Sequence, residues 1–482
     1  MSPSAVALGI IIAIVTLGSV IGFYAGARRK MDLEQWTVAG RGFGVLLMWL
    51  LMAGEVYTTF SFLGASGWAY SRGAPTLYIL AYITLAYVVS FFILPPIWEL
   101  GRRHKLQTQS DFFTWRYRSK YLAAAVSLVG IIFMIPYLEL QITGFGIIAE
   151  VASYDGIGRV PAMTVAVVLL AGFVLTGGLR AVAWVSVLKD ILMLIAAVAV
   201  GIGIPYAYFG GIGPMFTALV HAKPSHFVMP GATPNLGHSW YISTVLLTGL
   251  GVYMWPHSFG AAFSAKSSET LRRNAVIMPL YTLSLTLMLF VGFAAILVLP
   301  NLRDGDLSLL AMVRKTFPPW VLGIIGGAGA LTAMVPAAIL VLSSATVFAK
   351  NLFRPLFAPG INDHQVGRIA RLTVIVISAI SLYLAIHGST TLVALLLLAY
   401  AGITQLFPGV ILGLFWKRVS MPGVFAGLIF GVTSMAILFV TKHDPFLGLS
   451  AGFLGLCLNF TIAITLSLAF PAARAPDARE IY

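Results

Sequence analysis

MAGEVYTTFSFLGASGWAYSRG, residues 52–73, is hydrophobic enough to enter a membrane but differs from a plain membrane anchor. Glu55 lies inside it, and a carboxylate near mid-bilayer costs about 2–3 kcal/mol or more unless it is paired or protonated. Glycines and hydroxyl residues interrupt the apolar pattern, which favours local unwinding of a helix that lines a cavity. The interrupting residues are Gly54, Gly64, Gly67, Gly73, Tyr57, Thr58, Thr59 and Ser61. Broken helices are typical of the binding sites of secondary transporters, so we expect this span to form half of a substrate site.

The composition indicates an integral membrane protein. The chain has 482 residues, of which 59% are hydrophobic and only 10% are charged, and its mean hydropathy is +0.94. Such values exclude an ordinary soluble domain. The net charge of +14 does not indicate nucleic-acid binding, because the basic residues form short patches between apolar runs of about 20 residues. Cys457 is the one cysteine in the sequence, so neither an intrachain disulfide nor a cysteine metal site is possible.

Apolar runs separated by Gly, Pro and basic residues predict an all-α protein with about thirteen membrane spans. If the N-terminus is outside, most of the 30 lysine and arginine residues lie in inside segments, as the positive-inside rule requires. No basic residue precedes the first apolar run, so we expect a retained span and not a cleaved signal. The spans are predicted at 4–26, 43–71, 76–99, 121–149, 160–177, 183–209, 240–262, 274–300, 318–349, 369–387, 390–416, 421–441 and 446–470.

Glu55, Glu139, Asp190 and Lys189 are the charged residues that fall well inside predicted spans, where a charge is costly and usually functional. Lys189, in AVAWVSVLKDILMLIAA, is deep enough to act as a fixed internal cation or a proton carrier. The alternative is a structural pair, or a side chain that extends to the inner surface. Ser186 is one helical turn earlier and shares its face. Asp190 points about 100° away, so we expect the partner of Lys189 on another helix, with Glu55 as the candidate.

Two further spans carry polar residues that indicate either helix packing or substrate contact. In FMIPYLELQITGFG, Glu139 and Gln141 either bond to a neighbouring helix or contact the substrate. In GLGVYMWPHSFGAAF, the proline of the seventh predicted span indicates a helix break at depth. There, Tyr253, Trp255 and His257 either wall a cavity or serve the structure. No hydrolase, kinase or dinucleotide signature stands in a suitable context, so we expect no enzymatic activity and no cofactor.

Five segments, taken in order, resemble the sodium:solute symporter family, and most of all its bacterial monocarboxylate permeases. They are QWTVAGRGFG, FSFLGASGWAYSRG, TGGLRAVAWVSVLKDILM, SAKSSETLRRN and FWKRVSMPGVFAGLIFG. The resemblance implies one transporter domain, residues 1–482, with a LeuT-type fold in the bacterial inner membrane, surrounded by the lipid bilayer. Its parts are an extra N-terminal helix, two inverted five-helix repeats and trailing helices, at 4–26, 43–209, 240–416 and 421–470. We expect this multi-pass protein to be a monomer.

The family also implies where a sodium ion would lie, and this chain departs from that pattern. Sodium-coupled members surround the ion with backbone carbonyls of the broken first core helix and two adjacent hydroxyls of the eighth core helix. These hydroxyl positions correspond to Val335 and Pro336, which offer no side-chain oxygen, whereas Thr332 keeps one. On the fifth core helix the family's acidic residue is missing, and Lys189 follows Ser186 by one turn. We therefore expect no metal ion, and a lysine ammonium in its place.

These observations lead to the hypothesis of a proton-coupled secondary transporter that takes up small monocarboxylates such as lactate, pyruvate or acetate. Lys189, close to Glu55, would replace sodium, with Ser186 and Thr332 as further coupling residues. The substrate would bind between the broken helices, its charge met by backbone N–H groups at helix N-termini. The residues expected around it are Tyr57, Thr58, Ser61, Gln141, Tyr253, Trp255 and His257. A sodium-coupled symporter and a transport-like sensor without net flux are the alternatives.

Overall fold

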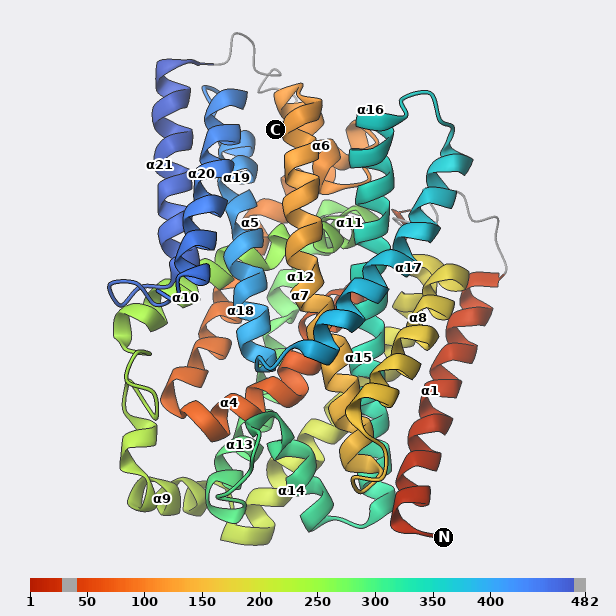
Figure 1. Cartoon of the computed structure of the whole chain (residues 1–482), viewed down its shortest axis with the longest axis vertical. Coiled ribbons are helices and arrows are strands. Elements are labelled where there is room, and N and C mark those ends of the chain that lie inside the picture. The colour runs from red at the N-terminus through yellow and green to blue at the C-terminus, as the bar shows by residue number, and fades with distance from the viewer. Residues whose placement is uncertain (28–40, 472–482) are drawn as a thin grey trace.

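The computed structural model describes residues 1–27 and 41–471, with the side chains of residues 25–27 and 176–180 outside that description. The segment QWTVAGRGFG, residues 35–44, therefore lies largely outside it. The described chain consists of helices joined by short loops (Figure 1). The elements up to residue 227 are α1 (Pro3–Ala27), α3 (Val45–Val56), η2 (Phe60–Gly64), α4 (Ala65–Arg72), η3 (Ala74–Leu77), α5 (Tyr78–Arg103), α6 (Gln109–Tyr117), α7 (Lys120–Ala152), α8 (Arg159–Phe209), α9 (Ile212–Ala222) and η4 (Pro224–Phe227).

The remaining elements complete an all-helical fold, as the sequence predicts. They are α10 (His238–Gly251), η5 (Val252–Met254), α11 (Pro256–Ser264), α12 (Ser268–Ile277), α13 (Pro279–Val298), η6 (Gly305–Leu307), α14 (Ser308–Thr316), α15 (Pro319–Val347), η7 (Phe348–Phe353), α16 (Arg354–Phe357), α17 (Asp363–His387), α18 (Leu392–Ile403), η8 (Thr404–Leu406), α19 (Phe407–Phe415), α20 (Met421–Val440) and α21 (Ala451–Ala469).

Within the described residues, ten helices are long and apolar enough to cross a membrane, or up to eleven if the bent pair α3 and η2–α4 is one span. The predicted spans that this count leaves out are those at 160–177 and 240–262. The first corresponds to a shorter apolar stretch of α8, Arg159–Leu175, and the second is divided between α10 and α11. The count of thirteen membrane spans and the position of the N-terminus on the outer side of the membrane stay predictions.

The first predicted helix break is confirmed. Helix α3 ends at Val56, and Tyr57 adopts an extended conformation with φ −84° and ψ 92°. The chain then forms the π-helical segment η2 and the helix α4, at an angle of 59° to α3. Gly73 ends α4 with a φ of +74°, a conformation that favours glycine, and the carbonyl oxygen of His226 fills the space of a Cβ atom there. The apolar run is thus two short helices around an irregular segment, as its glycines and hydroxyls indicate.

The second predicted break, in the span 240–262, is also confirmed. Helix α10 ends at Gly251, and the chain passes through η5 to Trp255, which is extended with φ −64° and ψ 137°. Helix α11 restarts at Pro256, because a proline at the first position of a helix needs no hydrogen-bond donor. The N–H of Phe43 donates to the carbonyl of Ser264 at 3.1 Å, which ties the start of α3 to the end of α11.

Helix α15 occupies the middle of the molecule, since nearly all of its residues from Leu322 to Val347 are buried, whereas most of α1 is exposed or half-buried. It packs against α1, α7 and α8. Helices α20 and α21 pack against each other at the opposite side of the molecule from α1 (Figure 1). The broken helices and α8 therefore meet inside a shell of apolar helices.

Candidate functional site

A small polar cavity lies between the two broken helices. Its volume is about 20 Å³, which is enough for one water molecule, so the site is closed around its lining residues. Apolar side chains of α3, η2, α5 and α18 form part of the wall. The polar lining consists of Glu55, Tyr82, Tyr137, Tyr253, Trp255, His257, Ser258 and Tyr400. Four of the residues expected at the site, Glu55, Tyr253, Trp255 and His257, are thus brought together around one cavity.

The carboxylate of Glu55 faces α11. Its side chain is 8% exposed, and the hydroxyl of Ser258 donates to Oε2 at 3.0 Å. The Nε2 atom of His257 lies 4.0 Å from the same oxygen. Oε1 is buried and has no hydrogen-bond partner within the described residues. Glu55 therefore joins the two broken helices through one oxygen and leaves the other free.

The ammonium of Lys189 lies against the end of α3. It has no exposed surface and donates to the carbonyl oxygens of Gly54 at 3.0 Å and Tyr57 at 3.1 Å. Gly54 leaves the space that the lysine needs, because a Cβ atom there would lie 3.2 Å from both Nζ of Lys189 and Oγ of Ser186. Ser186 itself donates to the carbonyl of Val182 at 3.0 Å. Lys189, Ser186 and the helix break therefore form one cluster.

The broken end of α3 leaves backbone carbonyls that no helical N–H can satisfy. Buried carbonyls need donors, and here side chains supply them. The donors are Lys189 to Gly54 and Tyr57, Tyr137 to Glu55, and Ser61 to Val56, at 3.0, 3.1, 3.1 and 2.5 Å. The partial negative charge at a helix C-terminus adds to the attraction for the ammonium. The break is thus stabilised by a cation together with two hydroxyls.

The structure does not form the expected ion pair between Glu55 and Lys189. Among the ion pairs of the described residues, Lys189 pairs with Asp190 at 3.1 Å, and Glu55 lies beside His257. The expectation that Asp190 points away from its neighbour is wrong, because a lysine side chain is long and flexible enough to turn back toward the next residue. Both side chains are completely buried, so each provides the opposite charge that the other requires.

Tyr57 and Gln141 were expected near the substrate, but they do not line the cavity. The hydroxyl of Tyr57 contacts the carbonyl of Tyr281 and the hydroxyl of Ser284 on α13. The Oε1 atom of Gln141 accepts from the N–H of Thr59 at 3.2 Å and from its hydroxyl at 2.7 Å. Both side chains hold the irregular segment against neighbouring helices.

Thr58, Ser61 and Thr332 also turn their hydroxyls toward the backbone. Oγ1 of Thr58 accepts from the N–H of Phe60 at 3.2 Å. Thr332, in the buried middle of α15, donates to the carbonyl of Ala328 at 2.7 Å. These bonds shape helices, and Thr58 and Ser61 lie outside the cavity lining.

Sequence reasoning missed several residues of the cavity. Ser258 directly follows His257 and could have been found from its place after the predicted break. Tyr137 adjoins Pro136 and offered a similar signal. Tyr82 and Tyr400 lie within long apolar helices, where nothing in the local pattern distinguishes a cavity residue from a packing residue.

A second cavity adjoins the first, and His257 lines both. This second space, of about 30 Å³, extends past Pro256 to Thr108, the residue before α6. A polar network lies near this second cavity. Lys350 donates to one carboxylate oxygen of Asp111 at 2.8 Å, and Asn351 donates to the other at 2.8 Å. The ring of His257 therefore lies between the central cavity and the second cavity, which extends toward the start of α6.

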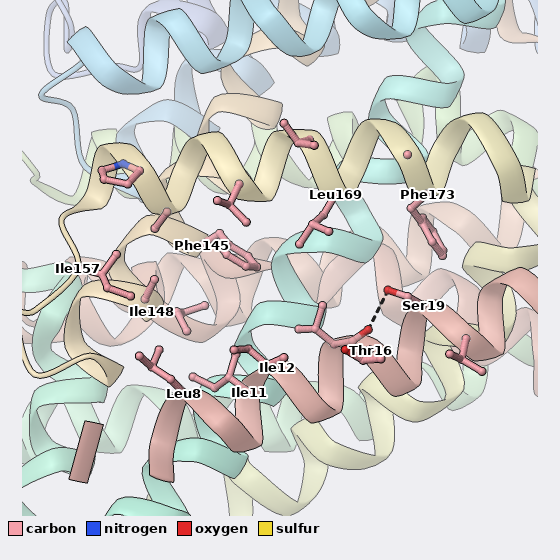
Figure 2. A pocket seen from close by; sticks show the side chains of 18 of the residues that line it. Leu8, Ile11, Ile12, Thr16, Ser19, Phe145, Ile148, Ile157, Leu169 and Phe173 are labelled. Atoms are coloured by element: carbon pink, nitrogen blue, oxygen red, sulfur yellow. Dashed lines mark hydrogen bonds between the residues drawn. The ribbon is translucent and has the colours of Figure 1, made fainter. Parts of the chain in front are cut away.

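A much larger pocket than the central cavity is an apolar groove of about 950 Å³ between α1, α7 and the first part of α8. Figure 2 shows its lining, with Ile12, Phe145 and Leu169 directed into the space. The hydroxyl of Ser19 donates to the carbonyl of Val15 at 2.8 Å, so its hydrogen bond is made to the backbone of its own helix (Figure 2). None of the expected site residues lines this groove. Its chemistry suits hydrocarbon and not a charged solute, so the central cavity is the candidate site.

Two broken helices that enclose a polar cavity within an apolar helical shell define a secondary transporter of the LeuT type. The chain belongs to the sodium:solute symporter family, whose model matches residues 36–431. It is 44% identical to the uncharacterized symporter YhjB of Bacillus subtilis, over 98% of this chain and 99% of that relative. It is 28% identical to a monocarboxylate transport permease of Rhizobium johnstonii, over 98% of both chains.

The fold is shared with solved structures of such transporters. A Na+-coupled sialic acid symporter, in its substrate-bound outward-open state, superposes with a TM-score of 0.81. The sequence identity is 18%, and the match covers 98% of this chain and 99% of that one. The resemblance stated from the sequence is thereby confirmed for the family and for the helical transporter fold.

Proposed function

We propose that the protein takes up small monocarboxylates and is driven by a proton gradient, with Lys189 in place of the family's coupling sodium ion. The observation that carries this proposal is the position of the ammonium, which donates to the carbonyls of Gly54 and Tyr57 at the break of the first core helix. Carbonyls of that break surround the ion in sodium-coupled members. Here the ammonium of Lys189, a cation that is part of the chain, donates to two of these carbonyls.

The residues present do not fit a sodium ion at this place. A hard cation requires several oxygen ligands, and the two hydroxyl positions of α15 are occupied by Val335 and Pro336. The hydroxyl of Thr332 is engaged with Ala328. An ammonium beside a sodium ion would also add electrostatic repulsion. We therefore derive no step of transport through sodium.

The relative named a monocarboxylate transport permease supports the substrate class, because its match extends over nearly the whole of both chains. The central cavity is compatible with a small solute. Its apolar wall suits a short alkyl group, and Glu55, His257 and Ser258 provide polar contacts. Because the cavity is closed, binding requires that the lining residues separate, as alternating access implies.

The test is uptake of radiolabelled lactate into proteoliposomes that contain the purified protein. An inward pH gradient without sodium should drive accumulation, whereas a sodium gradient at equal pH should not. Lys189→Ala should abolish accumulation, and Lys442→Ala, at an exposed loop, serves as the control. Strong stimulation by sodium alone would contradict the proposal. It would favour the second candidate, a sodium-coupled symporter, to which the coupling of the sialic acid symporter points.

A further inference from the structure

One oxygen of Glu55 is an unused hydrogen-bond acceptor inside the central cavity. Oε2 accepts from Ser258, but Oε1 is buried without a partner among the described residues. A buried acceptor without a hydrogen-bond partner is unfavourable, and more so when it is charged. A binding site recovers this cost when its ligand supplies the missing donor. The free oxygen thus indicates a ligand that carries a hydrogen-bond donor.

The start of α11, which contacts Oε2 of Glu55 through Ser258, also suits an anionic group. Helix α11 has nine residues and begins at Pro256, next to the cavity, and the N-terminal end of a helix attracts negative charge. The Nδ1 atom of His257 is buried there and, like Oε1 of Glu55, lacks a partner within the described residues. A carboxylate at α11 would therefore leave its neighbouring carbon within the cavity, toward Glu55.

The side chains that line the cavity offer a plain anion little stabilisation. Within the described residues, neither lysine nor arginine lines it, so no basic side chain of the lining pairs with a substrate carboxylate. The ammonium of Lys189 is directed to the carbonyls of α3 and to Asp190. The ionisable groups that face Glu55 from neighbouring elements are His257 on α11, Tyr137 on α7, Tyr82 on α5, Tyr253 on η5 and Tyr400 on α18. A donor on the substrate gives Oε1 of Glu55 the hydrogen-bond partner that it lacks within the described residues.

We propose that Glu55 selects monocarboxylates that carry a hydrogen-bond donor, a hydroxyl or an ammonium group, on the carbon next to the carboxylate. This inference rests on the proposed function and names its substrate class more closely. The donor binds Oε1 of Glu55, the carboxylate lies at the start of α11 beside His257, and the alkyl group contacts Phe60 and Leu396. Acids with a keto group or with no substituent at that carbon leave Oε1 unsatisfied.

The experiment compares four acids with the same three-carbon skeleton: lactate, alanine, pyruvate and propionate. Their binding to the purified full-length protein in detergent is measured by calorimetry. Lactate or alanine, or both, should bind at least about tenfold more tightly than pyruvate and propionate. Glu55→Met should bring all four to similar affinity. Glu55→Gln keeps an amide oxygen without charge, so it should retain a preference for lactate and lose one for alanine.

Glu269→Gln, on an exposed turn of α12, is the matched control and should keep the wild-type order of affinities. Thermal unfolding and size-exclusion profiles of each variant show that it is folded. Equal binding of all four acids by the wild-type protein would overturn the inference and leave the proposed function standing. A preference that persists in Glu55→Met would overturn it too. If none of the four acids binds or is transported, the proposed function itself fails.

Discussion

Lys189 and Asp190 are consecutive residues whose side chains form an ion pair of 3.1 Å without any exposed surface. The lysine ammonium reaches two carbonyls of the broken helix α3 as well, so the pair connects α8 to the break. Asp190 makes this arrangement electrically neutral. The charge that stabilises the helix break is therefore balanced inside the protein.

The first prediction concerns Asp190. Asp190→Asn should lower the free energy of unfolding by about 3–5 kcal/mol, because it leaves Lys189 as an uncompensated buried charge. The double variant Lys189→Met with Asp190→Asn removes the uncompensated charge but also the donors to Gly54 and Tyr57, so it should recover only part of this stability and none of the uptake. Reversible unfolding in detergent measures the stability of both variants, and uptake into proteoliposomes measures their transport. As a comparison, Arg273→Gln breaks an exposed pair with Glu269 and should cost at most about 1 kcal/mol. If Asp190→Asn costs no more stability than Arg273→Gln, the ion-pair explanation is wrong.

A second prediction follows from the close approach of Lys189 to Gly54. A methyl group at position 54 would lie 3.2 Å from the lysine nitrogen and from the hydroxyl of Ser186. We expect Gly54→Ala to displace the ammonium and to reduce the uptake rate at least about tenfold. The control is Gly9→Ala in α1, where no atom lies within 4 Å of the added methyl group. This substitution should leave uptake unchanged, and equal rates in both variants would contradict the assigned position of the lysine.

Gln141 gives a third prediction, on stability. Its Oε1 atom accepts from the N–H and the hydroxyl of Thr59 in the irregular segment between α3 and η2. Gln141→Leu leaves that buried N–H without a partner and should destabilise the protein by about 1–3 kcal/mol. Gln141→Glu keeps the acceptor oxygens, so its unfolding curve shows how a charge at this position changes the stability. Unfolding curves that coincide for the wild type and Gln141→Leu would show that this contact does not stabilise the break.

A fourth prediction concerns Asp306, in η6 between the membrane helices α13 and α15. Its Oδ2 atom accepts from the N–H of Leu392 at the start of α18, at 3.0 Å. Burial raises the pKa of Asp306 from 3.8 to about 7, against the opposing effect of the Leu392 N–H. The folded state therefore holds this proton more tightly than the unfolded state does, and stability falls as the pH rises from about 4 to about 7.

Asp306→Asn removes this titration and keeps an oxygen for Leu392. The variant should be more stable than the wild type at pH 8, and this advantage should shrink at pH 5. The measurement is the melting temperature of both proteins at the two pH values, in the same detergent. An identical difference at both pH values would show that Asp306 does not titrate in this range.

The sequence was sufficient to predict the two helix breaks, because each leaves a local signal. Glycines and hydroxyls around Tyr57, and the proline of the seventh span, cannot continue a regular apolar helix. The depth of Lys189 was also visible, since charged residues are rare in such runs. These predictions concern single helices, whose pattern is contained in consecutive residues.

Contacts between helices were harder to predict. Scarcity of charge suggested Glu55 as the partner of Lys189, but which carboxylate a flexible side chain reaches depends on packing in three dimensions. Likewise, Tyr57 and Gln141 looked suited to a substrate, whereas the broken backbone near them required donors and acceptors. The unsatisfied backbone of an irregular segment recruits nearby polar side chains first, and sequence alone does not show which ones remain free.

The ammonium of Lys189, which contacts the end of α3, differs from a dissolved ion in one respect. A dissolved ion occupies its site according to its concentration in the medium, whereas a side chain is present at a fixed local concentration whatever the salinity. It also cannot diffuse away on the far side of the membrane. A carrier built in this way should work equally well in fresh water and in brine.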